Sequence, residues 1–250
     1  MMLPDDEQAI KLRLLADIPI AIADAGFLRA PKLRLIAEIC ETHYNRLVAA
    51  LLFDASQLED VEADGISPFD LFCAYCRCNE PFRSLVLEGL ALFFQTKAAM
   101  AGAEEMNRFV LGDPAAGASG ASGHIHAGNF DRMQTVLKLA HHMKLPQGPE
   151  FRPANSRAKE MIDRIVKSRR SKPTGKQEMN LHSIVSGMAW RSPDLSIAAI
   201  FDLTIYQLYD GFFRLDHIDN YQFTMSGLYA GTVDGSQLNF ASIHWTTLIP

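Results

Sequence analysis

The chain has 250 residues, of which 48% are hydrophobic, and a net charge of −5 at neutral pH. This length and composition suffice for one large core or two smaller ones, as expected of a soluble globular protein. No apolar run approaches the roughly 18 residues of a membrane span. The first residues, MMLPDDEQAIKLR, are acidic where a secretory signal is basic, so we expect a cytoplasmic protein.

The charge is distributed unevenly along the chain. Between Arg152 and Lys176 there are nine Lys or Arg residues and two acids, so this segment carries +7 and the remainder carries −12. The sequence therefore predicts an acidic body with one basic arm.

The N-terminal third shows helical periodicity. Apolar residues recur at three- and four-residue steps after Pro31, which predicts a helix to about Phe53. Ser67, followed by Pro68, predicts the capped start of a short helix through Cys78. Asn79 and Pro81 repeat this chemistry, and the apolar segment 81–98 is expected to be a central helix.

The middle of the chain is less regular. MNRFVLG and GHIHAGNF predict two strands, joined by the small, flexible sequence DPAAGASGASG. Asn129 is expected to cap the next helix, FDRMQTVLKLAHHMKL. A turn-rich linker and the basic segment follow.

Apolar density returns after Met179. HSIVSGMAW predicts a short helix, and Ser196–Leu215 predicts a longer one. NYQFTMSGLYAG is expected to form another helix, and a V-D-G-S turn separates it from an end that carries Trp245.

These patterns predict a mainly α fold, with helical N-terminal and C-terminal bundles and a small two-strand β excursion between them. The predicted divisions are a helical domain at 1–100, a hairpin, loop and helix at 101–145, a basic linker or helix at 146–178, and an aromatic-rich helical domain at 179–250.

Two groups of residues raise the possibility of a metal-binding enzyme. Cys73, Cys76 and Cys78 lie close together, but within one helix their side chains diverge, and reduced structural thiols are the simpler interpretation. His124 and His126 would share one face of a strand, without an obvious third ligand. A metal-binding enzyme that uses either group stays as a second alternative.

The basic segment offers a different alternative, a nucleic-acid-binding adaptor. Its cations could neutralise phosphates, but aromatic residues for base stacking are missing from the segment and the whole chain is acidic. The patch consists of Arg164, Lys167, Arg169, Arg170 and Lys172.

Motifs for nucleophilic catalysis, phosphate loops, dinucleotide binding and zinc proteases are missing from the sequence. We therefore expect no enzyme, no catalytic residues, no metal and no cofactor.

Two stretches resemble a family of small proteins encoded in the tail-gene clusters of tailed bacteriophages and prophages. The first is GFLRAPKLRLIAEICETHYNRLVAALLFD, with its G-x-L-x-x-P lead, and the second runs from NLHSIVSGMAW through DLTIYQLYDGFFRL to IHW. HIHAGNFDRM between them is similar to the strand-to-helix entry of that family, whereas Asp113–Gly123 departs from the pattern as an insertion.

The resemblance implies a non-enzymatic tail morphogenesis protein, either an assembly chaperone or a structural tail component. It further implies phage partners of the tape-measure or tail-tube type, in the host cytoplasm or retained in the virion tail. Neither a membrane nor nucleic acid is the expected partner, and self-association stays open.

Such a protein needs apolar surface on rigid helices, and the C-terminal region is rich in aromatic residues that suit interfaces. Some of these rings are expected to fill the core, with the Tyr206, Tyr209 and Phe213 side facing a partner. The predicted partner-binding residues are Phe201, Tyr206, Tyr209, Phe213, Tyr221 and Trp245, and Phe223 and Tyr229 extend the same aromatic surface.

Overall fold

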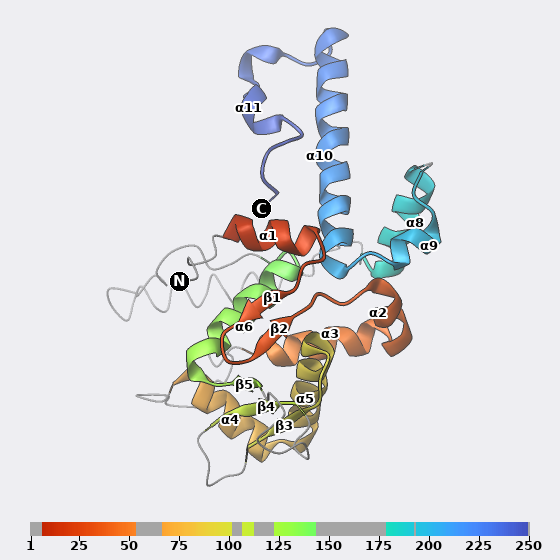
Figure 1. The fold of residues 1–250 in the computed structure, drawn as a ribbon. Coiled ribbons are helices and arrows are strands. Elements are labelled where there is room, and N and C mark those ends of the chain that lie inside the picture. Colours follow the sequence, from red (N-terminus) through yellow and green to blue (C-terminus); the bar gives the residue numbers. More distant parts are fainter. Residues whose placement is uncertain are drawn as a thin grey trace, which may run out of the picture.

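The computed structural model describes residues 7–53, 67–101, 107–112, 123–143, 179–192 and 194–249. Residues 113–122 of the predicted Gly/Ser-rich loop and the whole basic segment lie outside these ranges. The described chain is mainly α, as predicted, and contains two small antiparallel sheets (Figure 1). Its elements are α1 Glu7–Leu15, β1 Ile20–Ile22, β2 Gly26–Leu28, α2 Leu33–Ile39, α3 Glu41–Leu51, α4 Pro68–Cys78, α5 Glu80–Phe94, β3 Ala98–Met100, β4 Phe109–Leu111, β5 Gly123–Ile125, α6 Ala127–Ala140, α8 Leu181–Arg191, α9 Ile197–Phe201, α10 Ile205–Tyr229, a 3₁₀ turn at Gly235–Gln237 and α11 Phe240–Ile243.

The helix predicted from Pro31 to Phe53 is two helices. Cys40 separates α2 from α3 with a φ of 73°, a backbone conformation that interrupts a right-handed helix. The apolar periodicity continues across the break, which explains why the sequence indicated one helix.

The capping predictions for α4 and α5 are confirmed. The Ser67 hydroxyl accepts the Asp70 N–H at 3.1 Å, and the Asn79 side chain accepts the Phe82 N–H at 3.0 Å. Helix α5 ends at Phe94, earlier than predicted, because Gln95 adopts a left-handed conformation and the chain then enters β3.

The two predicted strands are β4 and β5, which pair antiparallel with Phe109 opposite Ile125. A third strand, β3, pairs with the other edge of β4, and β1 and β2 form a separate hairpin that was not predicted. β5 passes close to that hairpin: the His124 N–H donates to the Asp24 carbonyl at 2.6 Å.

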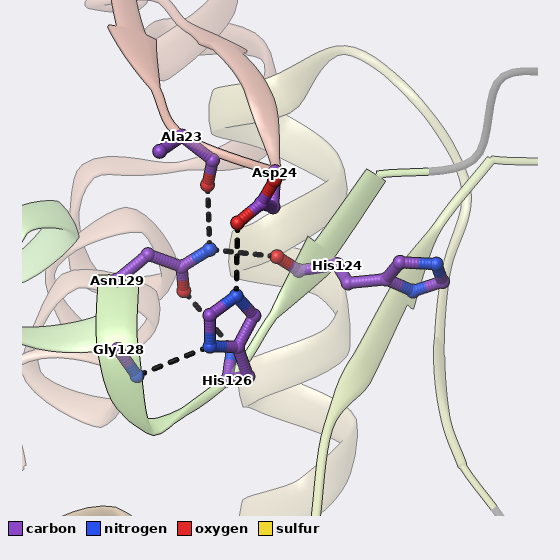
Figure 2. A network of polar contacts seen from close by, with 6 residues as sticks. All are labelled: Ala23, Asp24, His124, His126, Gly128 and Asn129. Carbon is purple, nitrogen blue, oxygen red and sulfur yellow. Dashed lines mark hydrogen bonds and ion pairs between the residues drawn. The ribbon is translucent and has the colours of Figure 1, made fainter.

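The cap of α6 is His126 rather than the predicted Asn129. Figure 2 shows His126 Nδ1 accepting the Gly128 N–H, while the Asn129 amide oxygen accepts the His126 N–H. The Asn129 amide nitrogen donates to the carbonyl oxygens of Ala23 at 2.7 Å and His124 at 2.8 Å. Asn129 is buried, and it ties the start of α6 to both the β1–β2 turn and β5.

One apolar cluster contains buried residues from α1 through the start of α10. Its aromatic centre joins α4, β4 and α6, where the ring centres of Phe72 and Phe130 are 4.8 Å apart and those of Phe72 and Phe109 are 5.8 Å apart. Side chains from the predicted divisions 1–100, 101–145 and 179–250 therefore pack into one continuous core.

The helix predicted at Ser196–Leu215 is interrupted at residues 202–204. There the backbone bonds to the chain around the start of α2: the Leu33 N–H donates to the Leu203 carbonyl at 2.9 Å, and the Ile205 N–H donates to the Pro31 carbonyl at 3.0 Å. Thr204 then caps α10, which continues for 25 residues and includes the stretch expected to form another helix.

None of the helices in the described ranges is both long enough and apolar enough to cross a membrane.

Candidate functional site

The six predicted partner-binding aromatics occupy three different places in the structure. Tyr206, Tyr209 and Phe213 surround one histidine near the base of α10; Phe201 lines an apolar pocket beside α8; and Tyr221 and Trp245 lie on the outer part of α10 and its returning tail. The three places differ in exposure.

The first group surrounds His142, which follows the end of α6. The ring centre of His142 is 4.7 Å from that of Tyr206 in a stacked arrangement, and 5.6 Å from that of Phe213. Tyr206 is 3% exposed, and burial raises the pKa of its phenol. These contacts hold the base of α10 against α6, so Tyr206 has no accessible ring to offer a partner.

The second feature is the outer half of α10, residues 217–229, which is called the arm below. All buried residues of this 25-residue helix, Ile205, Tyr206 and Leu208, lie near its N-terminal end. At about 1.5 Å per residue the helix is about 37 Å long, and Figure 1 shows it rising away from the rest of the protein. The outer half is therefore held by few tertiary contacts.

The C-terminal tail turns back along this arm and packs against it only partly. The Arg214 guanidinium donates to the carbonyl of Thr247 at 2.9 Å and also to that of Trp245. The ring centres of Tyr221 and His244 lie 5.2 Å apart, and His244 stacks on Trp245. Arg191 of α8 forms an ion pair with Asp219 on the arm. The tail thus orders one side of α10 and leaves another side open.

Large aromatic side chains remain exposed on the open surfaces. Phe223 is 74% exposed and Tyr229 is 82% exposed on the arm, while Trp245 is 44% exposed on the tail. Trp190, at the end of α8, is 84% exposed and was not among the predicted residues. Trp190 follows Gly187 by three residues and Ser183 by seven, on the face of α8 away from its apolar residues, and this spacing could have indicated its exposure. Exposed Trp, Tyr and Phe rings are typical of protein interfaces.

The cysteines lie in two environments. Cys73 and Cys76 are buried in the core, and burial raises the pKa of each thiol to about 12, whereas Cys40 and Cys78 are exposed. Thiolates are the metal-binding form of cysteine, so burial disfavours ligation by Cys73 and Cys76. Their packing accounts for them as core residues.

The predicted His124 and His126 pair does not share one face of a strand. His126 lies after β5 and turns toward Asp24, with Nε2 3.4 Å from the carboxylate, while Figure 2 shows the His124 ring pointing away from it. Within the ranges that the structure describes, no three His, Cys, Asp or Glu residues form a group that could hold a metal ion. The predicted basic patch, Arg164, Lys167, Arg169, Arg170 and Lys172, lies outside those ranges.

The geometry so far defines a helical protein with a projecting aromatic arm. Residues 171–249, which include α8 to α11, match the family model described as the YomV second domain. The match covers 79 of the 250 residues and contains the whole of the stretch from NLHSIVSGMAW to IHW, on which the resemblance to phage tail-cluster proteins partly rests. No curated protein and no solved structure matches the chain.

Proposed function

We propose that this chain is a non-enzymatic phage tail morphogenesis protein that binds another tail protein through its C-terminal arm. The observation that carries the proposal is that the outer half of α10 leaves the core while exposing Phe223 and Tyr229. Exposed apolar area of this kind is costly in water and becomes favourable when a partner covers it.

The partner surface that we propose differs from the one indicated by the sequence. It comprises Tyr221, Phe223 and Tyr229 on the arm and Trp245 on the tail. Trp190, on α8, is a further contact residue outside this group. Phe201 belongs to a separate pocket, and Tyr209 and Phe213 support the base of α10 through His142. The expected partner is a tape-measure or tail-tube protein, bound during assembly by a chaperone or permanently by a structural component.

Co-purification with the tape-measure and tail-tube proteins of the same phage tests this proposal. Phe223→Ser combined with Tyr229→Ser is expected to abolish capture without lowering the melting temperature, since both rings are exposed. Phe27→Ser is a matched control, because Phe27 is 62% exposed on β2, whose hairpin belongs to the body of the protein and not to the arm (Figure 1). Capture that is unchanged in the double variant, or absent with the wild-type protein, would contradict the proposal.

A further inference from the structure

An apolar pocket lies where α8 and α9 pack beside α2. Its lining does not include any aromatic residue of the arm. Its volume is about 320 Å³. It is lined by Leu33, Ile36, Ala37, Glu41, Leu181, His182, Val185, Ser186, Ile197 and Phe201. This volume lies at the lower end of the range of about 300–1,000 Å³ for ligand pockets, so it suits one large apolar group rather than an extended ligand.

The walls and the mouth of the pocket differ in exposure. Ile36 is completely buried and Leu33 and Val185 are nearly so, whereas Ala37 is exposed and Ile197 is 49% exposed. The pocket is therefore a recess with a preformed apolar floor that a group from outside can reach.

Glu41 gives this recess a negative charge. One of its carboxylate oxygens accepts the Leu181 N–H at 3.0 Å, which fixes the side chain at the start of α8. Among the described residues, no Lys or Arg lines the pocket, and the exposed Glu38 lies three residues before Glu41, on the other side of the break at Cys40. Covering a carboxylate with apolar material is costly unless a cation accompanies it.

We infer that this pocket receives an apolar side chain from a helix of the partner protein, with a Lys or Arg of the same helix placed against Glu41. The inference rests on the proposed function and deepens it by naming the chemistry of the partner. A helix presents residues three and four apart on one face, so one turn can supply both the anchor and the cation. Anchors of this kind, seated in pockets, carry much of the binding energy of interfaces.

Three probes with one six-carbon chain test the chemistry directly: n-hexylamine, hexan-1-ol and hexanoate. Binding is followed by NMR of the methyl groups of Ile36, Val185 and Ile197 in the full chain. The amine is expected to bind about two- to fivefold more tightly than the alcohol, as for a partly exposed ion pair, and hexanoate is expected to bind most weakly. Equal affinities, or no shift at these methyl groups, would overturn the inference.

Variants separate the local charge from general electrostatics. Glu41→Gln keeps an oxygen for the Leu181 N–H and is expected to remove the preference for the amine. Glu38→Gln removes the same charge three residues earlier in the chain, outside the pocket lining, and is expected to keep the preference. If both variants behave alike, Glu41 does not select the ligand and the inference fails.

Ala37→Trp tests the pocket as a docking site. Ala37 is exposed at the mouth, so a large ring there is expected to block all three probes and to leave the melting temperature unchanged. It is also expected to abolish co-purification with the tape-measure or tail-tube protein. Capture that survives Ala37→Trp but is lost in the Phe223 and Tyr229 double variant overturns the pocket inference alone. Failure of the wild-type protein to capture either partner overturns the proposed function and this inference together.

Discussion

The hydroxyl oxygen of Tyr44 lies 2.6 Å from Nε2 of His141, in a pair that joins α3 to the end of α6. His141 Nδ1 lies 2.7 Å from the Leu137 carbonyl, so the proton is on Nδ1 and Nε2 accepts the hydroxyl proton of Tyr44. Burial lowers the pKa of His141 to about 4 and raises that of Tyr44, so both groups are neutral at pH 7. The two hydrogen bonds satisfy an imidazole that would otherwise be costly to bury.

This pair makes stability depend on acid. The folded-state pKa of His141 is below its ordinary value of 6.5, so protons favour the unfolded chain. The contribution is complete above pH 6.5 and is lost as the pH falls toward 4, by about 3 kcal/mol. Urea unfolding at intervals between pH 7 and pH 4 measures the loss, to which His142 adds with the same sign because burial also lowers its pKa. Stability that stays constant over this range would contradict the assignment.

Tyr44→Phe isolates the hydrogen bond within the same pair. The ring stays in place but His141 Nε2 loses its donor, and a buried acceptor left unpaired costs about 1–3 kcal/mol. Tyr75→Phe is a matched control, since the Tyr75 hydroxyl accepts only a 3.3 Å bond from the Asn79 amide. Chemical denaturation at pH 7 should show a clearly larger loss for Tyr44→Phe than for the control.

Two glycines should respond in opposite directions to alanine. A Cβ at Gly123 would lie 2.3 Å from the carbonyl oxygen of Ala25, where the β1–β2 turn meets β5, so Gly123→Ala forces two backbones apart. A Cβ at Gly187 in α8 meets no atom within 4 Å, so Gly187→Ala should stabilise by about 0.5–1 kcal/mol through helix propensity. Melting temperatures of the two variants should fall on either side of the wild type.

The Asn129 amide supports a sharper test of the α6 start. Asn129→Asp preserves the acceptor for the His126 N–H but removes the donors to Ala23 and His124, and it places a carboxylate in a buried site. We expect a loss of at least about 2 kcal/mol. Asn79→Asp keeps the acceptor that caps α5 and removes only the 3.3 Å bond to the Tyr75 hydroxyl, which can itself donate to a carboxylate, so it should be nearly neutral. Equal losses for both would mean that the donors of Asn129 contribute nothing.

The sequence predicted those features that depend on local chemistry. Ser67 and Asn79 were identifiable because a capping side chain and its N–H partner lie within three residues of each other. His126 was missed because histidine is not among the preferred capping residues. The break at Cys40 has no sequence signal, because a positive φ at cysteine is imposed by the surrounding structure. The β1–β2 hairpin was missed since its strands have only three residues each.

The candidate site was predicted less completely, because exposure depends on tertiary contacts. The sequence placed aromatics on α10 but could not show that His142, from α6, would bury Tyr206. It also separated α10 into two helices at the polar residues after Leu215, although a polar stretch without Pro does not end a helix that projects into solvent. The pocket lined by Phe201 combines residues about 160 positions apart, so no local pattern could indicate it.

These differences determine how the aromatic residues should be tested. Tyr206→Ala removes a buried ring and is expected to cost about 3–5 kcal/mol, so loss of partner binding in that variant would reflect unfolding. Tyr229→Ala changes an exposed ring and should leave the unfolding midpoint within about 0.5 kcal/mol of the wild type. Thermal unfolding measured beside co-purification distinguishes the two effects.

Phe223→Ala provides the decisive member of this series, because Phe223 is exposed on the arm and is distant from the His142 cluster along α10. It should match Tyr229→Ala in stability and should reduce partner capture, since both rings are available for contact. Gln222→Ala, at an exposed neighbouring polar position, should affect neither measurement. A Phe223→Ala variant that is strongly destabilised would show that the arm is covered within the protein itself, which would remove the physical basis for assigning partner binding to it.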